Sequence, residues 1–528
     1  MNRVRDDSEA PAPCLQLHLD DAGRLTDASG TRSWSTGAEL PSDGPMRNGV
    51  FARWSASDER ALVETDSLGL QSLFVARTTN RIFVSPSIPT LLASLRAMHE
   101  MNPTEAADAV AFDFDAIAAF CIVGFFVGDR TPFAGIRAAP PGWRLESDAA
   151  GTRITQFEPN PEITQLDDEA LVDELIRRFR TSVERRVANA TRPEIVTLTG
   201  GKDSRHIAHE LARQVGKANV RAVTVERLRR AGDDDTSVAV RVAAGLGIDH
   251  QAVPGTAFTL AHEYSKNVAT NFNAMDHGWA HPLGAVFQPG DRVWDGLSGD
   301  VVIDGTYSSR AQLDAARSGD RVAWSQRLTT IRGGTQRLIH ASMGELAPSL
   351  DVAAGCELLQ AEMAQHLDRP NPVSSFWFWN RTRRAVSVAA TGLYGSGVDV
   401  VFPFADTDLW SLGMSVPGER MIGQHLQRQM LERDHPDAMI LPFANSDFSL
   451  RARIARLPNH VRRLGGAFAA DGRGVVERAR IAGQAASLLA RPGRRSECIM
   501  YPLNVSRLRA WRRSIERASR GSMARTER

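Results

Sequence analysis

Residues 194–208, EIVTLTGGKDSRHIA, impose the strongest constraint on how this chain can fold. A short apolar run ends in two glycines, and a segment with helical spacing follows at once. This order is typical of a strand–helix unit in a parallel sheet. Glycines at such a corner let the backbone approach a ligand, and the helix start offers free N–H groups to an anion. The stretch predicts an α/β fold with an anion site where a strand ends.

The pattern on both sides of this corner extends the prediction to a whole sheet. Segment 166–188 has helical spacing with an acidic start, and strand and helix patterns alternate after it. The expected strands cover 194–199, 219–225 and 291–297, and the expected helices cover 204–215 and 234–247. Strands that alternate with helices predict a parallel α/β sheet.

The first part of the chain has a different texture. Short alternating runs such as GVFARWSA and RIFVS, broken by Gly, Ser and Asp, predict a β-rich domain. The uncharged run 116–128 is too short to span a bilayer and predicts a core helix. We predict three parts: a β-rich domain at 1–160, the parallel-sheet domain at 161–465, and an arginine-rich helical segment at 466–528.

Cysteine usage and the first residues indicate a cytoplasmic protein. The four cysteines are far apart in the sequence, with no disulfide framework and no metal-ligand spacing. Buried reduced thiols are therefore expected. The start MNRVRDDSEAPAP is charged and interrupted by proline, which argues against a signal peptide. No segment is predicted to span a membrane.

The net charge of +1 conceals a basic C-terminal part. Residues 451–528 hold 19 arginines and five acidic residues. Such a segment fits an acidic peptide or an acidic partner protein, or it is simply a solvated helix face. Nucleic acid is the weakest of the partners considered, because no aromatic residues are interleaved with the basic ones.

Three motifs resemble those of one enzyme superfamily. TGGKDS (199–204) is similar to the pyrophosphate loop SGGxDS of N-type ATP pyrophosphatases, and it lacks the spacing of a Walker loop or a dinucleotide fingerprint. VWDGLSGDVVIDG (293–305) resembles the SGxGxDExxxG segment of asparagine synthetases, and GVDVVFPFAD (397–406) resembles their GLEARVPFLD. With an N-terminal hairpin and linker that also match, the resemblance to the asparagine synthetase superfamily covers about 40–460 in collinear order.

This resemblance implies a fold, two cofactors and a set of site residues. The fold would join a degenerate Ntn-hydrolase-like β-rich domain to a parallel-sheet ATP-pyrophosphatase domain of the adenine nucleotide α-hydrolase-like kind. The cofactors would be ATP and Mg²⁺, the latter held by Asp203 and Asp300, with Asp304 next in line if the gap-free alignment of that segment is wrong. Contacts to ATP and pyrophosphate are expected from Thr199, Gly200, Gly201, Lys202, Asp203, Ser204, Arg205, Val225, Gly296 and Gly299.

For Lys202 and Asp399 the sequence leaves two roles open. The side chain of Lys202 either reaches phosphate or points to solvent. Asp399 is expected to be the base that takes the amine's proton, and the alternative is a surface aspartate before a strand. The resemblance also places an acidic pair at Asp234 and Asp235 and a histidine at His250.

Two departures from the family pattern narrow the expected activity. Glutamine-hydrolysing members need an N-terminal cysteine, but this chain begins Met-Asn and its first cysteine is Cys14, so glutaminase activity is not expected. A late family lysine also has no counterpart, because Asn445 stands in its place. Arg451 or Arg453 lies nearby, and the residue that replaces the lysine stays open.

Lasso peptide cyclases and β-lactam synthetases, which have lost the same cysteine, are the members this chain resembles most. We predict an ATP-dependent ligase that adenylates a carboxylate, releases AMP and pyrophosphate, and forms a macrolactam in a precursor peptide. A leader-peptide-binding protein and a protease are the expected companions. The alternatives are a ligase acting on a small-molecule carboxylate and amine, and an inactive nucleotide-binding scaffold. The sequence identifies neither the substrates nor the oligomeric state.

Overall fold

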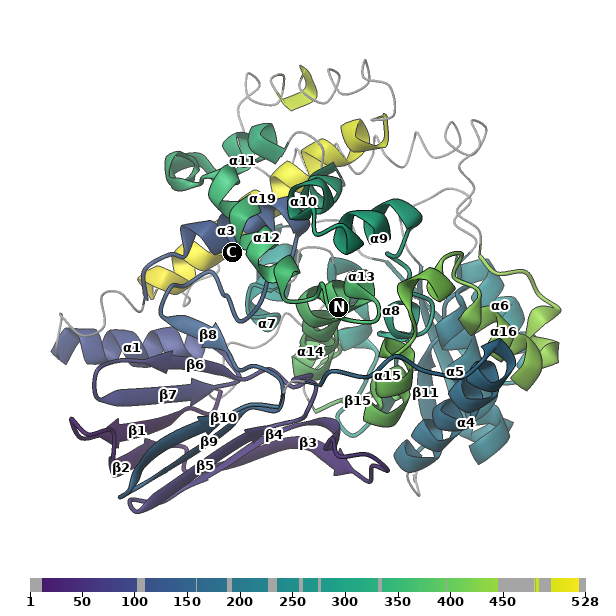
Figure 1. Ribbon diagram of the computed structural model, residues 1–528, viewed down its shortest axis with the longest axis horizontal. Helices are drawn as coiled ribbons and strands as arrows, with labels where there is room; N and C mark the ends of the chain where they lie inside the picture. The colour runs from purple at the N-terminus through teal and green to yellow at the C-terminus, as the bar shows by residue number, and fades with distance from the viewer. Residues whose placement is uncertain are drawn as a thin grey trace.

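The computed structural model describes residues 12–101, 110–157, 159–187, 192–226, 235–255, 260–273, 277–330, 335–395, 397–444, 479, 481–483 and 495–521. These residues form two antiparallel sheets and one parallel sheet, each of five strands. Figure 1 shows the antiparallel sheets at the lower left, the parallel-sheet unit at the right and a layer of helices above. Among the residues described here, no helix is long and apolar enough to cross a membrane.

The two antiparallel sheets confirm that the first part of the chain is rich in β-structure. One has the order β2-β1-β7-β6-β8 and the other the order β10-β9-β5-β4-β3. They face each other through apolar side chains that include Leu17, Trp54 and Val63. The strands are β1 (Leu15–Leu19), β2 (Leu25–Gly30), β3 (Ser33–Leu40), β4 (Asn48–Ala56), β5 (Arg60–Thr65), β6 (Phe74–Arg77), β7 (Arg81–Ser85), β8 (Ile136–Ala138), β9 (Arg144–Asp148) and β10 (Gly151–Thr155).

Helices α1 (Ile88–Met101), α3 (Phe114–Val123) and α19 (Arg495–Arg520) share one core with the sheet of β6 and β7. Helix α3 confirms the core helix predicted in the run 116–128. Helix α19 confirms helix in the arginine-rich segment, but one of its faces is apolar and carries Leu508, Trp511 and Ile515 into this core. The Trp511 ring stacks on Phe120 with centroids 4.5 Å apart. The described part of the basic segment is therefore packed and not a free appendage.

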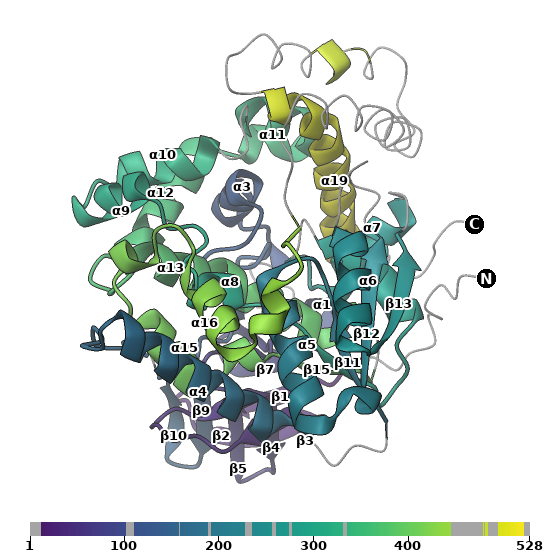
Figure 2. The same cartoon turned by 90° about the vertical axis from the view of Figure 1, so that its right-hand side faces the viewer.

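The parallel sheet confirms the strand–helix alternation. Its order is β13-β12-β11-β14-β15, and every neighbouring pair is parallel. Figure 2 shows α4, α5 and α6 beside β11, β12 and β13. The strands are β11 (Glu194–Thr197), β12 (Val220–Glu226), β13 (Asp249–Pro254), β14 (Arg292–Trp294) and β15 (Asp399–Val401), and the helices are α4 (Asp168–Arg186), α5 (Lys202–Val215) and α6 (Asp235–Leu246).

One helical run is irregular. Residues 372–393 pass through α13 (Pro372–Trp377), a π-helical turn (Phe378–Thr382), α14 (Arg383–Val388) and a second π-helical turn (Ala389–Leu393), which is kinked at Gly392 (φ 132°). Such turns are rare and are frequent at functional sites. The other helices are α7 (Leu260–Ala269), α8 (Gly299–Val302), α9 (Arg310–Arg317), α10 (Arg321–Thr330), α11 (Thr335–Met343), α12 (Val352–Ala364), α15 (Thr407–Met414) and α16 (Leu426–Asp434).

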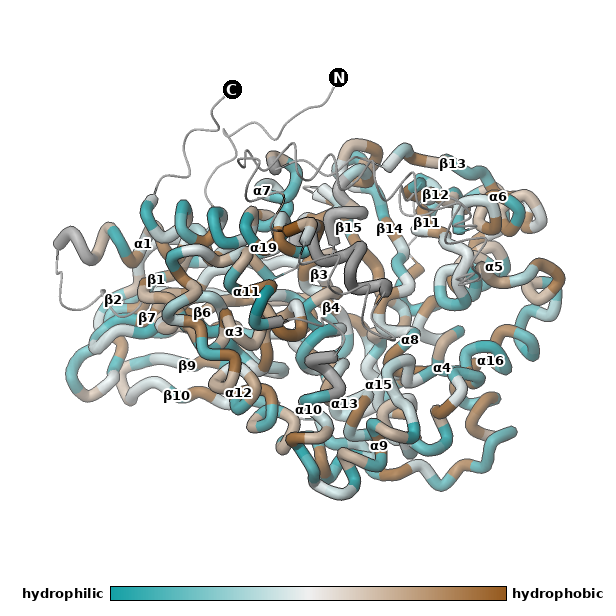
Figure 3. The backbone as a smooth tube through the Cα atoms, turned by 90° about the horizontal axis from the view of Figure 1, so that it is seen from above, coloured by the Kyte–Doolittle hydropathy of each residue, from teal (hydrophilic) through white to brown (hydrophobic). Residues whose placement is uncertain are grey.

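A buried polar contact joins the β-rich part to the parallel-sheet unit. Seen from above, β1, β2 and β7 lie at one end of the molecule and β11, β12 and β13 at the other (Figure 3). Between them, Asp406 accepts hydrogen bonds from Asn48 Nδ2 (2.6 Å) and from Arg186 Nη1 (2.7 Å). Because all three side chains are buried, the aspartate that ends the FPFAD motif has a structural role here.

Candidate active site

The loop between β11 and α5 is closed by hydrogen bonds from its own hydroxyl side chains. Ser204 Oγ accepts from Thr199 N (3.0 Å) and lies 3.1 Å from Thr199 Oγ1, and Thr199 Oγ1 in turn accepts from Gly201 N (3.2 Å). A Cβ at Gly200 would come within 2.3 Å of the Ala444 side chain, so only glycine allows this close approach. The sequence TGGKDS thus produces a tight loop at the start of a helix, as predicted.

Three carboxylates lie together beside this loop. Asp203 is in the first turn of α5, Asp300 is in α8, and Asp304 follows α8. A Cβ at Gly299 would be 2.6 Å from Asp203 Oδ1, and one at Gly296 would be 2.9 Å from Asp203 Cβ. The two glycines therefore let the 296–300 segment lie directly against the start of α5. Asp203 and Asp300, 97 positions apart in the printed sequence, are brought together as predicted.

The electrostatics of these carboxylates call for a cation. Burial raises the pKa of Asp203 well above its ordinary value, and the negative charges of Asp300 and Asp304 raise it further. Burial also raises the pKa of Asp300, whereas the charge of Arg381 lowers it. Asp203 Oδ1 is buried and has no hydrogen-bond partner. A buried carboxylate oxygen without a partner, among other carboxylates, fits the oxygen ligands that Mg²⁺ prefers.

Lys202 follows neither of the two alternatives considered from the sequence. Its Nζ forms a short ion pair with Asp304 Oδ2 and donates to the carbonyl oxygen of Gln424 (3.0 Å). The other oxygen of Asp304 accepts from Gln427 N (2.8 Å). Lys202 and Asp304 therefore neutralise each other and tie the loop to the start of α16.

Arg205 also differs from its expected contact with pyrophosphate. Its side chain is fully buried, and its guanidinium donates to the carbonyl oxygens of Ala438 (2.8 Å), Leu441 (2.7 Å) and Pro442 (3.0 Å). It also lies over the Phe443 ring, 4.3 Å from the centroid. In this structure Arg205 fixes the 438–443 segment against α5, and both terminal nitrogens are engaged there.

We therefore expect Arg205→Met to lower the free energy of unfolding by about 2–4 kcal/mol, because buried carbonyl oxygens lose their donors. A thermal melt of the variant against the wild-type protein measures this, and Arg213→Met, which alters a half-exposed arginine of the same helix, is the control. A variant that melts like the wild type but has lost pyrophosphate affinity would restore the role expected from the sequence.

The neighbouring strand β12 carries Val225, the next of the expected ATP-binding residues. Val225 lies near the carboxyl end of β12, next to the loop after β11. Asp235 begins α6 and its Oδ1 accepts from Gly200 N (3.2 Å), so this acid supports the loop. His250 Nε2 is 2.9 Å from Thr224 Oγ1. Asp234, Asn445, Arg451 and Arg453 lie outside the described residues.

Sequence reasoning missed two side chains of this region. Tyr394, just after the second π-helical turn, donates a short hydrogen bond to Asp295 Oδ2, which also accepts from Thr197 Oγ1 (3.3 Å). Arg381, in the first π-helical turn, acts electrostatically on Asp300 and lies over the Tyr307 ring, 5.4 Å from its centroid. Neither residue belongs to a motif, and only the irregular helical run 372–393 directs both toward the carboxyl edge of the sheet.

Asp399 is not brought to this cluster. It opens β15 in register with Arg292, the first residue of β14, whereas Asp295 follows the other end of β14. Asp295 is three residues beyond Arg292, so it lies about 10 Å from the level of Asp399 along the strand direction. The Asp399 side chain is 60% exposed and pairs with Arg292 Nε (3.1 Å). Asp399 therefore lies at the amino edge of the sheet, opposite the edge that holds Asp203 and Asp300.

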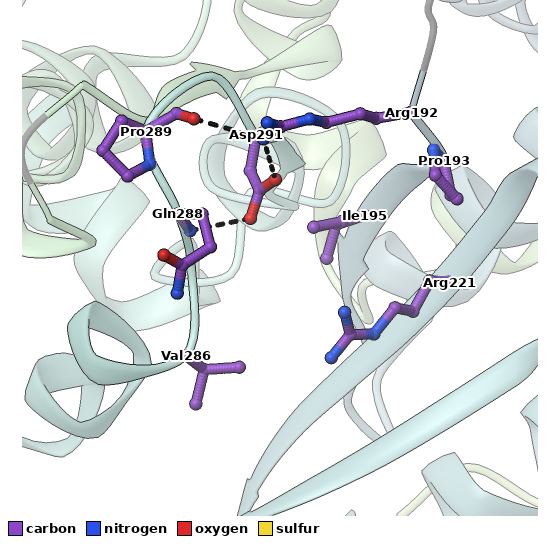
Figure 4. A pocket seen from close by; sticks show the side chains of 8 residues that line it. All are labelled: Arg192, Pro193, Ile195, Arg221, Val286, Gln288, Pro289 and Asp291. Atoms are coloured by element: carbon purple, nitrogen blue, oxygen red, sulfur yellow. Dashed lines mark hydrogen bonds and ion pairs between the residues drawn. The ribbon is translucent and has the colours of Figure 1, made fainter.

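The amino edge also has a pocket of its own, of about 480 Å³. Figure 4 shows Arg192 directed at Asp291, with Arg221 on the other side of the opening. The pocket is lined by Arg192, Pro193, Ile195, Arg221, Val286, Gln288, Pro289 and Asp291. Because strand starts line it, this pocket is separate from the carboxylate cluster at the strand ends.

One comparison with known proteins identifies a family. The sequence model of the asparagine synthase family matches residues 174–482, which is more than half of the chain. No curated protein sequence matches this chain.

Among solved structures, the U34-tRNA thiolase of Methanococcus maripaludis, with its iron–sulfur cluster, is similar at 15% identity and a TM-score of 0.21, over 51% of this chain and 76% of that one. An NH₃-dependent NAD synthetase from Campylobacter jejuni is similar at 12% identity and a TM-score of 0.18, over 38% and 95% respectively. A glutamine phosphoribosylpyrophosphate amidotransferase from B. subtilis is similar at 12% identity and a TM-score of 0.13, over 39% and 32%.

Proposed function

Because this chain belongs to the asparagine synthase family, we propose that it is an AMP-forming ligase that adenylates a carboxylate and joins it to an amine. The observation that carries the proposal is the meeting of Asp203 and Asp300 beside the TGGKDS loop, with a buried oxygen that has no partner. ATP is the expected nucleotide and Mg²⁺ the expected cation. The ligand chemistry of these two carboxylates supports Mg²⁺, and the family supports ATP.

Residues at the carboxyl edge have different proposed roles in adenylation. Backbone N–H groups of the first turn of α5 would hold the pyrophosphate. The N–H groups of Thr199, Gly200 and Gly201 donate to Ser204, Asp235 and Thr199 side chains, and these bonds fix the loop. Mg²⁺ held by Asp203 and Asp300 would screen the charge of the phosphates. We propose that Arg381 supplies the positive charge that the missing late lysine provides elsewhere, since its charge already acts on Asp300.

Amide formation requires a group that takes a proton from the attacking amine. Asp399 was expected to do this, but Asp295 lies at the carboxyl edge, acts electrostatically on Asp203 and is bonded to the Tyr394 hydroxyl. We therefore propose Asp295, positioned by Tyr394, in preference to Asp399. The reaction consumes one carboxylate, one amine and ATP, and it releases AMP, pyrophosphate and the proton that Asp295 accepts.

The proposed substrate is a linear precursor peptide that is closed into a macrolactam, as in lasso peptide cyclases. Two features support a peptide: the β-rich part is retained beside the ligase unit, and Arg513, Arg517 and Arg520 are exposed on α19. Failure of peptides together with turnover of a small carboxylate and amine would instead support a small-molecule ligase.

We also propose that the β-rich part does not hydrolyse glutamine. Burial raises the pKa of Cys14, whose thiol donates to the Leu15 carbonyl oxygen (3.8 Å) and accepts from Ser94 Oγ (3.6 Å). A thiol with a raised pKa is a poor nucleophile at neutral pH. Purified protein given glutamine should release no glutamate above background, with or without ATP, in a coupled dehydrogenase assay. Glutamate release that Cys14→Ala abolishes would contradict this.

A further inference from the structure

A second cluster of ligand side chains lies on the far side of α5 from the nucleotide loop. His206 and Glu210 are one helical turn apart on α5, and Asp434 and His435 lie at the end of α16. The nearest imidazole and carboxylate atoms of His206, Asp434 and His435 all lie within 4.8 Å of one another. The side chains of His206, Asp434 and Glu210 are fully buried, and His435 is 10% exposed.

Three separations in this cluster are close to those between the ligands of a tetrahedral metal site. His206 Nε2 is 3.2 Å and His435 Nε2 is 3.6 Å from Asp434 Oδ2, and His435 Nε2 is 3.3 Å from Glu210 Oε2. Zinc binds such nitrogen and oxygen atoms at about 2.0–2.2 Å, so neighbouring ligand atoms of a tetrahedron lie roughly 3.3 Å apart. His435 Nε2 is buried and makes no hydrogen bond of ordinary geometry. The ligand atoms are thus already spaced for an ion.

The surroundings of the cluster can orient its ligands. The Gln427 amide nitrogen is 3.3 Å from His206 Nδ1, and the Gln427 carbonyl oxygen has no partner. Turning this amide over would let His206 Nδ1–H donate to the oxygen and leave Nε2 for a metal. Arg180 holds the outer oxygen of Asp434 and leaves Oδ2 facing the histidines. A surface hollow of about 410 Å³ reaches Asp434 from solvent.

We propose that His206, Asp434 and His435 bind one zinc ion, whose fourth position is open to water or to Glu210, 3.3 Å from His435 Nε2. The ion would join α5, which begins at the nucleotide loop, to α16, whose start is tied to Asp304. Its role is structural: it would hold the helix that carries Asp203 in place. This proposal does not depend on the ligase activity.

Zinc binding to the full chain tests the proposal. Protein stripped with EDTA should bind one Zn²⁺ per chain in competition with a chromophoric chelator, and Co²⁺ in its place should show the visible bands of tetrahedral cobalt. His435→Ala and Asp434→Asn should each weaken binding more than about 100-fold, since changes outside the ligand shell alone cost about 10–100-fold. Zinc should also raise the thermal midpoint of the wild-type protein and not that of these variants.

Two controls separate this site from other causes. His209→Ala alters a histidine of the same helix, 5.4 Å from the His435 ring but outside the ligand set, and should bind zinc as the wild type does. Asp300→Asn should also bind zinc normally, which separates this site from the nucleotide site. The proposal is wrong if the wild-type protein binds no stoichiometric zinc, or if the folded double variant Asp434→Asn/His435→Ala still binds it.

Discussion

Asp203→Asn and Asp300→Asn should each reduce carboxylate-dependent ATP–pyrophosphate exchange by at least about 10³-fold, because each removes a charged ligand of the cation that screens the phosphates. The fold should survive, since Asp203 Oδ1 has no hydrogen-bond partner to lose. Circular dichroism and a thermal melt check the fold. Relief of repulsion between the two carboxylates should leave each variant as stable as the wild type, or more stable.

Binding of a non-hydrolysable ATP analogue gives a second readout that needs no substrate. Calorimetry should show Mg²⁺-dependent binding to the wild-type protein and loss of that dependence in both variants. Because the pKa of Asp203 is raised, the metal-free site holds a proton up to a higher pH than an ordinary carboxyl group does. Mg²⁺ must displace this proton, so Mg²⁺ affinity should increase with pH. Asp291→Asn, at the amino edge, is the matched control and should behave as the wild type. Near-full exchange in Asp300→Asn would move the metal role to Asp304.

Asp295→Asn should stop amide formation while sparing adenylation. Removal of a general base costs about 10²–10⁴ in rate, and the proton is taken only after the acyl-adenylate has formed. Tyr394→Phe removes only the hydroxyl that positions Asp295 and should reduce amide formation less. Pyrophosphate exchange and product formation, measured separately for each variant, resolve the two half-reactions.

Asp399→Asn is the comparison that decides between the two candidate bases. Asp399 is exposed and paired with Arg292 at the amino edge, so this variant should retain both half-reactions. Loss of product with intact exchange in Asp399→Asn, together with an active Asp295→Asn variant, would restore the expectation drawn from the sequence. Equal loss of exchange and product in Asp295→Asn would place Asp295 in nucleotide binding or folding.

The sequence predicted the parts of the fold that depend on local pattern. Strand β11, the TGGKDS loop and α5 follow from an apolar run, two glycines and a helical period, and the structure has all three. The meeting of Asp203 with Asp300 also follows, because both come after neighbouring parallel strands whose ends share an edge. These inferences needed only chain order and strand direction.

What could not be predicted depends on the geometry of longer segments. Arg381 lies in the first of two π-helical turns and Tyr394 follows the second. No sequence motif marks these turns, so neither residue could be assigned to the site from the sequence. The motif alignment assigned Asp399 as the base, but Asp399 begins the short strand β15 and therefore lies at the amino edge of the sheet, away from Asp203 and Asp300. A solvated helix face was one interpretation of the arginine-rich segment. The structure shows that α19 also has an apolar face, which packs Trp511 into a core.

The central claim is that this chain transfers the adenylyl group of ATP to a carboxylate, with release of pyrophosphate, and that an amine then displaces AMP. The most direct measurement uses synthetic linear peptides with an isotopically labelled side-chain carboxylate and a free α-amine, with aspartate and ammonium as a second substrate pair. We predict that the labelled oxygen appears in AMP and that the peptide becomes lighter by one water. Formation of ADP and phosphate, or of unlabelled AMP, or the absence of AMP with every substrate while ATP still binds, would contradict the account.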